Sequence, residues 1–365
     1  MKIASARIFP LALGLARPVA TAHGRLTRRE ALRVVLVDTD GRLGRGECAP
    51  LPAFGTETLR TAGRVLERLA PRLEGVELED PPALPAELDS LLEAAPTARA
   101  GVDTALHDLA SQRAGLALGE LLARRAGRRA HATVPAGSLL VETNPSDVAD
   151  AARRAVSSGF GALKLKVGAG DAALDARRVA AARRGAGPEA TLGLDANGAW
   201  TPEEALRRIE SFAESRVAWV EQPVAAWDVA GLAFVRHRAR VSIVADESVL
   251  RSADARRVLE AGAADRLALK PAALGGLVAA EAVAERARAA GVEVAVTSFL
   301  DGAVGLAAAL HFAASLPGPL PPCGLATGHL VYGDDLAPPL AGKGSLAVPR
   351  GPGLGLAAAA RAAGP

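Results

Sequence analysis

At 365 residues the chain is long enough for one large domain and a smaller one, because single hydrophobic cores stop growing at roughly 250 to 300 residues. Half of the residues are hydrophobic but only 3% are aromatic, which argues against the stacking platforms that bind single-stranded nucleic acids. The net charge of +3 arises from 43 basic and 40 acidic residues without a long basic run, so we expect no nucleic-acid partner.

Residues 1–60 have the pattern of an antiparallel meander. The apolar run of residues 9–16 contains Pro10 and is followed by a second strand-like run at 32–38, so we expect two paired strands rather than a signal peptide. Residues 38–41, with the sequence Asp-Thr-Asp-Gly, are typical of a hairpin turn.

A helical pattern follows from residue 58 to about residue 122. It is interrupted by the Pro-rich segment 81–85. Together these patterns predict an α+β domain that covers residues 1–128.

Short apolar strands then alternate with helices rich in Ala and Arg, which is typical of a parallel sheet built from βα units. The expected strand ends lie 24 to 30 residues apart, at Ala136, Lys166, Asp195, Glu221, Asp246, Lys270, Ser298 and Leu325. Eight strands at this spacing favour a closed TIM-type barrel over residues 129–339, with an open doubly wound sheet as the alternative. Residues 340–365 are rich in Gly and Pro, and we expect them to pack back on the first domain.

The chain shows no run of about 20 apolar residues, so we expect no membrane partner. Cys48 and Cys323 are too few for a disulfide framework or a thiolate metal site, and a reducing cytoplasm is the simplest location.

Lysine is rare in this sequence. Only five of the 43 basic Lys and Arg residues are lysines, at positions 2, 164, 166, 270 and 343. Because a guanidinium does not release its proton in proteins whereas an ammonium can, the lysines at strand ends are candidates for acid–base chemistry.

Charged residues end five consecutive predicted strands. In a parallel barrel these ends form one rim, where catalytic groups lie. Asp195, Glu221 and Asp246 would place three carboxylates there, which would repel one another without a cation. Oxygen ligands suit Mg²⁺ or Mn²⁺, and three of them leave coordination positions for water and a small carboxylate substrate.

Lys164 and Lys166 are two residues apart on one strand and therefore point to the same side, where like charges and a nearby dication disfavour protonation. Lys166 is thus a candidate general base. Lys270 ends the sixth strand, which lies opposite the second in an eight-stranded barrel, so it would face Lys166 across the metal-bearing strands.

This arrangement resembles the enolase superfamily, specifically its muconate-lactonizing-enzyme subgroup. The motifs Lys-x-Lys, Asp-x-Asn, Glu-Gln-Pro, Asp-Glu-Ser and Lys-Pro occur in the family's order over nearly the whole chain. The resemblance implies a modified (β/α)₇β barrel with an α+β capping domain completed by the C-terminal segment. It also implies that Asp195, Glu221 and Asp246 bind the metal, that Lys166 and Lys270 flank the substrate, and that Lys164 tunes Lys166. The residues expected beside the substrate or behind the metal ligands are Asn197, Glu247, Ser298 and Gly275.

Family chemistry then implies that an α-proton is removed from a carboxylate substrate to give an enediolate. Within the subgroup the chain is most similar to the o-succinylbenzoate synthases, which dehydrate 2-succinyl-6-hydroxy-2,4-cyclohexadiene-1-carboxylate in menaquinone biosynthesis. Four stretches carry this likeness, at residues 18–24, 46–55, 297–305 and 323–328.

Two alternatives stay open. An N-succinyl- or N-acylamino-acid racemase or a dipeptide epimerase would use the same lysines, although the Asp-x-Asp by which dipeptide epimerases bind the substrate ammonium is replaced here by Leu325-Ala326-Thr327. A homologue that binds metal and carboxylate without turnover belongs to another class, and the presence of both Lys166 and Lys270 argues against it. A homo-oligomer is possible.

Overall fold

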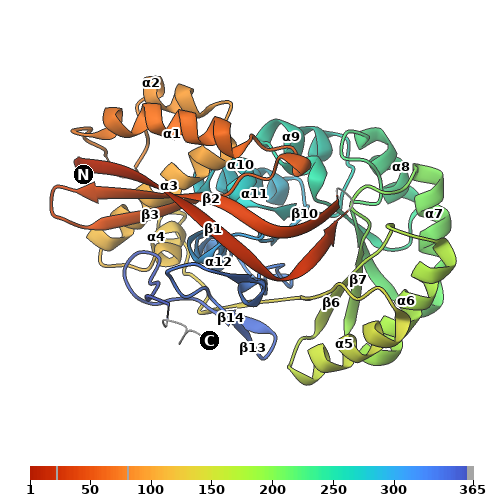
Figure 1. The fold of residues 1–365 in the computed structure, drawn as a ribbon. Coiled ribbons are helices and arrows are strands. Elements are labelled where there is room, and N and C mark those ends of the chain that lie inside the picture. Colours follow the sequence, from red (N-terminus) through yellow and green to blue (C-terminus); the bar gives the residue numbers. More distant parts are fainter. Residues whose placement is uncertain (22–23, 80–81, 360–365) are drawn as a thin grey trace.

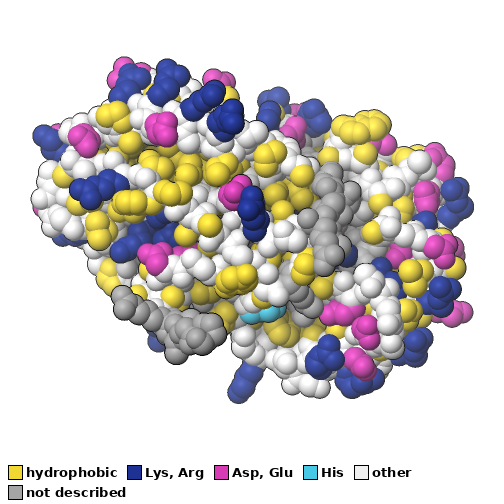
Figure 2. Space-filling model, in the orientation of Figure 1, with side chains coloured by type: hydrophobic (Ala, Val, Ile, Leu, Met, Phe, Trp, Pro, Cys, Tyr) yellow, Lys and Arg dark blue, Asp and Glu magenta, His cyan; other side chains and the backbone are white. Residues whose placement is uncertain are grey.

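The computed structural model describes residues 1–21, 24–79 and 82–359. Figure 1 shows a smaller part built on a long antiparallel hairpin beside a ring of helices that surrounds parallel strands. None of the described helices combines the length and the hydropathy that a bilayer crossing requires. On the face drawn in Figure 2, basic and acidic side chains are interspersed around the margin of the molecule.

The first part combines an antiparallel sheet with helices. Its strands are ordered β12-β1-β2-β3. Its elements are β1 (Ile3–Thr21), β2 (Gly24–Asp38), β3 (Leu43–Cys48), α1 (Leu59–Leu73), α2 (Ala86–Asp89), α3 (Pro96–Arg113), α4 (Leu118–Arg125) and β12 (Val331–Tyr332). The prediction of an α+β fold for this part is confirmed.

The expected hairpin forms because β1 and β2 pair in antiparallel register, with Phe9 opposite Arg33. Asp38 organises the turn that follows β2, since its carboxylate accepts hydrogen bonds from the backbone amides of Asp40 and Arg42. Of the stretch 18–24 noted above, residues 18–21 belong to the end of β1 and residue 24 begins β2. Residues 22–23 of that stretch and residue 81 of the Pro-rich segment lie outside the described residues.

Helix α3 lies against β3 at a very short distance. A Cβ atom on Gly46 would stand 1.7 Å from the carbonyl oxygen of Gly101, so only glycine permits this packing. Helix α1 covers the same core with residues at helical spacing, and the Thr58 side chain caps its first turn.

The second part is the parallel barrel. Seven strands are ordered β11-β10-β9-β8-β7-β6-β5, and they are β5 (Ser138–Leu140), β6 (Ala162–Lys166), β7 (Thr191–Asp195), β8 (Val217–Glu221), β9 (Ser242–Ala245), β10 (Arg266–Leu269) and β11 (Glu293–Val296). Parallel bridges from Cys323 to Ala136 and from Gly324 to Thr297 close the ring. The expected eighth strand is reduced to these bridges, since Pro321 and Pro322 before it have no amide hydrogen to donate. The first barrel strand, β5, begins only after its expected end at Ala136, which forms the isolated bridge to Cys323.

Helices cover the outside of the barrel. They are α5 (Pro145–Ser157), α6 (Ala172–Ala186), α7 (Pro202–Ser211), α8 (Val229–Arg238), α9 (Ser252–Glu260), α10 (Pro271–Leu274), α11 (Leu277–Ala289) and α12 (Ala303–Ser315). Helix α7 is capped by Thr201, whose side chain accepts a hydrogen bond from the amide of Glu204. Helix α12 has buried residues on all sides, which explains its almost wholly apolar sequence.

The C-terminal segment contacts both parts. Strand β14 (Ser345–Ala347) pairs with β13 (Ala341–Gly342) and with β4 (Thr133–Pro135). Gly353 exchanges backbone hydrogen bonds with Leu116 and Leu118 of the first part. The boundaries 1–128, 129–339 and 340–365 stay a proposal.

Candidate active site

A cavity of about 150 Å³ lies at the carboxyl ends of the barrel strands. The three expected metal ligands and the three expected lysines all line it. The four sequence stretches noted above also reach it, through Val19, through Leu51 and Phe54, through residues 297–300, and through residues 323, 324, 326 and 327. Most of the residues that line the cavity therefore belong to the motifs and stretches singled out in the sequence.

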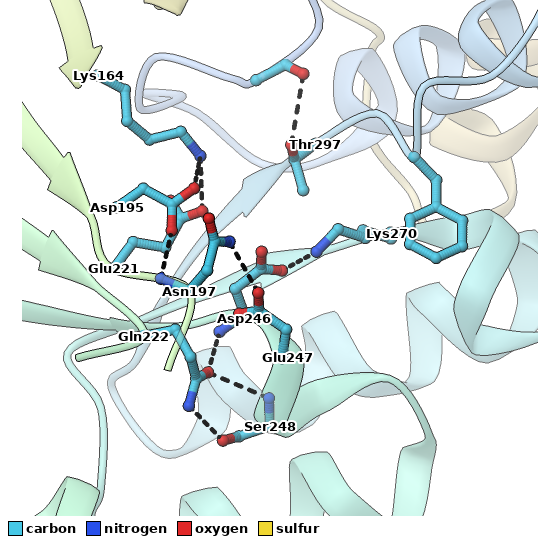
Figure 3. A network of polar contacts seen from close by, with 12 residues as sticks. Lys164, Asp195, Asn197, Glu221, Gln222, Asp246, Glu247, Ser248, Lys270 and Thr297 are labelled. Atoms are coloured by element: carbon cyan, nitrogen blue, oxygen red, sulfur yellow. Dashed lines mark hydrogen bonds and ion pairs between the residues drawn. The ribbon is translucent and has the colours of Figure 1, made fainter. Parts of the chain in front are cut away.

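Strand register brings the acids and lysines together. Lys166 on β6 is the partner of Asp195 on β7, which is in turn the partner of Glu221 on β8. The Lys166 Nζ donates to Asp195 Oδ2 at 2.9 Å, and the Lys164 Nζ donates to Glu221 Oε1 at 2.6 Å and lies 3.7 Å from Asp195. Lys270, at the end of β10, pairs with Asp246 at the end of β9 (Figure 3).

Burial and mutual charge set the proton affinities in this cluster. Burial disfavours the charge on Lys164, but Glu221 and Asp195 outweigh it and raise its pKa above the ordinary lysine value. Burial would also raise the pKa of Asp195, yet the ammonium groups of Lys166 and Lys164 hold it at about 2. Burial, aided by the charges of Lys164 and Lys166, lowers the pKa of Lys270 to about 7 against the attraction of Glu221 and Asp195. Lys164 is thus a fixed cation, whereas Lys270 can exchange a proton near neutral pH.

The donor set suits a divalent cation. Asp195, Glu221 and Asp246 are 2%, 5% and 6% exposed, and they supply only oxygen ligands from three adjacent strands. Within the described part of the chain, however, no three His, Cys, Asp or Glu side chains converge tightly enough to form a ready-made cluster. Lysine ammonium groups pair with the carboxylates instead, so an ion bound here replaces these contacts. The lysines themselves partly neutralise the three acids, which strand order alone does not indicate.

Asn197 and Glu247 stand directly behind the lysine and its carboxylate. The Asn197 Oδ1 accepts from Lys166 Nζ at 2.7 Å, and its Nδ2 donates to Glu247 Oε1 at 2.8 Å. Burial and the nearby charge of Asp195 raise the pKa of Glu247 to about 7. The structure therefore places both residues where the sequence expected them, with Asn197 fixing the direction of the Lys166 side chain.

Gln222 is a residue that sequence reasoning passed over. It is fully buried, and its Oε1 accepts from the amides of Asp246 and Ser248, while its Nε2 donates to Val224 O and Ser248 Oγ. Figure 3 shows the amide joining the end of β8 to the end of β9. Its backbone φ of 40°, rare outside glycine, was not visible in the sequence.

Ser298 lines the cavity as expected, and its Oγ accepts from the amide of Leu300 at 2.9 Å. Gly275 does not reach the cavity, and its expected place beside the substrate is corrected here. It ends α10 in the left-handed conformation, with φ of 99°, and lies against Arg99 of α3. The short helix after Lys270 carries the chain away from the rim.

Comparison with known proteins agrees with this geometry. The family described as mandelate racemase / muconate lactonizing enzyme, N-terminal domain, matches residues 3–123, and the family described as enolase C-terminal domain-like matches residues 147–362. The chain belongs to the enolase superfamily, in its muconate-lactonizing-enzyme subgroup. It is therefore an enzyme of a superfamily that uses a divalent metal to abstract protons α to a carboxylate.

Several members of this superfamily are similar to the chain over most of its length. The L-Ala-D/L-Glu epimerase of Bacillus subtilis is 33% identical over 86% of both chains. Muconate cycloisomerase 1 of Rhodococcus opacus is 30% identical over 98% of this chain and 96% of its own. The N-succinyl-L-Arg/Lys racemase of Bacillus cereus is 26% identical over 86% of this chain and 85% of its own. These relatives do not single out the o-succinylbenzoate synthase that the sequence suggested.

A solved structure of a similar superfamily member contains Mg. The dipeptide epimerase from Enterococcus faecalis complexed with Mg and the dipeptide L-Leu-L-Tyr superposes with a TM-score of 0.86 at 29% identity, covering 98% of this chain and 100% of the other. The expected barrel and capping domain are confirmed by this likeness.

Proposed function

We propose that this enzyme is a racemase or epimerase of N-acylated amino acids with apolar side chains. Its reaction moves a proton away from and back to the carbon beside the carboxylate. The observation that carries the proposal is that Lys166 and Lys270 reach one cavity from β6 and β10, strands that three other strands separate. A substrate between them would present opposite faces of its α-carbon to two amines.

The two lysines would exchange roles between the two directions. One Nζ takes the α-proton from one face while the ammonium of the other returns a proton to the opposite face. Lys164 stays charged beside Lys166, and Asn197 holds the Lys166 Nζ in place. A divalent ion held by Asp195, Glu221 and Asp246 would bind the substrate carboxylate and supply the positive charge needed as the proton leaves.

The charges around the cavity favour an acylated nitrogen over a free ammonium. Among the described residues that line it, the only acids are the three proposed metal ligands, and Lys164, Lys166 and Lys270 lie among them. Arg266 also lines the cavity, but it begins β10 and its guanidinium is paired with Glu293. The segment after the last strand contributes Ala326 and Thr327 and no carboxylate. A substrate ammonium would therefore be buried without a counterion, which costs about 3 kcal/mol or more.

The outer wall favours an apolar side chain. It is formed by Val19, Leu51, Phe54, Phe299 and Leu300. These residues provide no charged partner for a substrate side chain, so burial of apolar surface is the attraction that they offer.

Dehydration of 2-succinyl-6-hydroxy-2,4-cyclohexadiene-1-carboxylate is the second candidate. The same cationic cavity and the same absence of an ammonium partner suit its two carboxylates, and the Lys270 Nζ lies 5.9 Å from the ring centre of Phe299, beside the space that a substrate ring would occupy.

The test compares leucine substrates that have an acylated or a free terminal amino group, and it includes the cyclohexadiene acid. Purified protein with Mg²⁺ is given N-acetyl-L-leucine, N-succinyl-L-leucine, the dipeptide L-Ala-L-Leu and the cyclohexadiene acid, and products are followed by chiral chromatography and ultraviolet absorbance. We expect kcat/KM for the better acylated leucine to exceed that for the dipeptide by about 100-fold, the equivalent of an unpaired buried charge. A preference for the dipeptide would overturn the acyl assignment, and turnover of the diene acid alone would establish the second candidate.

A further inference from the structure

The cavity is roofed by two chain segments from different parts of the molecule. Leu51 and Phe54 belong to the segment after β3, and Phe299 and Leu300 belong to the loop between β11 and α12. Leu51, Phe299 and Ala273 form a small buried cluster that is separate from the cores of both parts, and Phe54 packs against it. The Phe54 and Phe299 rings meet edge to face, with centroids 6.1 Å apart.

One buried arginine contacts both segments. Arg29 on β2 is 3% exposed, and its guanidinium donates to Ala49 O at 2.6 Å and to Pro50 O at 2.7 Å. Its Nε donates to Leu300 O at 3.3 Å. The same guanidinium lies over the Phe299 ring, 5.7 Å from the centroid. Arg29 itself is not part of the cavity wall.

The loop between β11 and α12 depends on such external support. Leu300 has a φ of 55°, a conformation that a leucine rarely adopts unless its surroundings impose it. Asp301 and Glu47 provide the negative charge that favours a cation at Arg29. A planar guanidinium with five donors can reach carbonyls in two separate segments at once, whereas the compact ammonium of a lysine can reach only one of the two segments.

We propose that Arg29 is a positioning residue that sets the shape of the substrate side-chain pocket by tying residues 49–54 to residues 299–300. Loss of this tie leaves Lys166, Lys270 and the carboxylates in place but loosens the roof. The cost then falls on substrate binding more than on proton transfer.

The test uses two variants of Arg29 and one matched control. Arg33 lies on the same strand and is equally buried, but its guanidinium pairs with Asp334 at 2.8 Å and contacts neither Ala49, Pro50 nor Leu300. Arg29→Met removes every donor, Arg29→Lys keeps one ammonium within reach of the Ala49 and Pro50 carbonyls, and Arg33→Met removes the neighbouring ion pair. Hydrogen–deuterium exchange of peptides covering 49–54 and 299–302 is measured on the full-length variants with Mg²⁺.

We expect Arg29→Met to speed exchange in both segments by about tenfold, the change that one lost charged hydrogen bond produces. Arg29→Lys should restore slow exchange at 49–54 but not at 299–302. Arg33→Met should lower the unfolding temperature while leaving exchange at 49–54 unchanged. Wild-type exchange at 299–302 in Arg29→Lys, or equal acceleration at 49–54 in Arg33→Met, would overturn the proposal.

A second experiment measures steady-state kinetics, and its interpretation rests on the proposed function. With acylated amino acids of increasing apolar side-chain size, Arg29→Met should raise KM by about tenfold for the largest substrates and change kcat less than KM. If the wild-type enzyme does not turn over acylated amino acids, the proposed function fails, and the exchange measurements still decide the role of Arg29. If Arg29→Met does not fold, the segment-specific result for Arg29→Lys decides it.

Discussion

Lys166 illustrates what a single residue at the rim contributes. Its Nζ contacts Asp195 Oδ2 and Asn197 Oδ1, so its direction is fixed by a proposed metal ligand and by an amide anchored to Glu247. An arginine at this position would retain the charge but could not accept the substrate proton. In a chain that uses arginine for most of its positive charge, the lysines at positions 166 and 270 agree with the proposed acid–base chemistry.

Replacement of Lys166 tests its role as a base. We expect Lys166→Ala to lower kcat by about 10² to 10⁴, the usual effect of losing a general base, and Lys166→Arg to recover little of it. Steady-state kinetics and circular dichroism on both variants make the measurement. Near-normal rates in the arginine variant would show that position 166 supplies only positive potential.

Gln222 makes a different kind of contribution, because its four hydrogen bonds join the strand ends that carry Glu221 and Asp246. Gln222→Met keeps the shape of the side chain but leaves the amides of Asp246 and Ser248 without their acceptor. We expect Mg²⁺ affinity to fall about 10- to 100-fold, as is typical when a residue that orients a metal ligand is lost. Isothermal titration calorimetry measures this, with Arg33→Met as the control for general destabilisation. Unchanged Mg²⁺ affinity in a folded variant would rule out the positioning role.

Residues at the site differ in how readily the sequence revealed them. The sequence placed the proposed metal-ligand carboxylates, Lys166 and Lys270 in one cavity because each ends or directly follows a strand, and strand ends share one rim. Gln222 and Arg29 could not, because their main partners are backbone groups whose positions depend on the folded chain. Gly275 was misplaced because nearness to Lys270 in sequence does not show which way the short helix α10 leads.

At the scale of elements, the alternation of strands and helices predicted the barrel and the order of its strands. It did not predict that the last strand would shrink to two bridges, because the pairing there depends on Pro321 and Pro322 and on contacts with Ala136 and Thr297. Nor did it show why α12 is apolar on all sides. The neighbours of that helix include α4 and the C-terminal segment, which are distant in sequence.

His311 joins these three elements and makes their packing sensitive to pH. Its Nδ1 accepts from the amide of Gly119 on α4, and its Nε2 donates to Leu354 O. Burial lowers the pKa of His311 to about 4, below the ordinary 6.5. The unfolded chain therefore binds this proton first as the pH falls, so folding stability should decline between pH of about 6.5 and about 4, by roughly 3 kcal/mol in total.

Chemical denaturation across that pH range measures the effect. Wild type and His311→Gln share every other titrating group, so the difference between their two pH profiles isolates this histidine. As the pH falls from about 6.5 to about 4, the free energy of unfolding of the variant should decline by roughly 3 kcal/mol less than that of the wild type. Parallel profiles would mean that His311 takes up its proton equally in the folded and unfolded states.

At the scale of the whole molecule, the barrel supplies the acids and lysines while the first part supplies Val19, Leu51 and Phe54 to the same cavity. The proposed function therefore divides chemistry and selectivity between the two parts. Arg29, Arg33 and Glu47 hold these parts together through buried contacts to residues 300–305 and Asp334. Composition and strand spacing predicted both parts. The junction could not be predicted, because arginines are abundant in this sequence and only the fold shows which of them are buried.

Solvent deuterium exchange shows whether the enzyme removes and returns the α-proton of acylated amino acids in a metal-dependent reaction. The enzyme is incubated in D₂O with N-succinyl-L-leucine and N-acetyl-L-leucine, with Mg²⁺ or with EDTA, and the α-proton is followed by nuclear magnetic resonance. We expect loss of the α-proton signal with Mg²⁺ and formation of the D enantiomer at a comparable rate, neither change with EDTA, and no D enantiomer in Lys166→Ala. Undiminished exchange in metal-free enzyme, or retention of the α-proton by a folded enzyme that binds Mg²⁺ and these substrates, would contradict the proposed function.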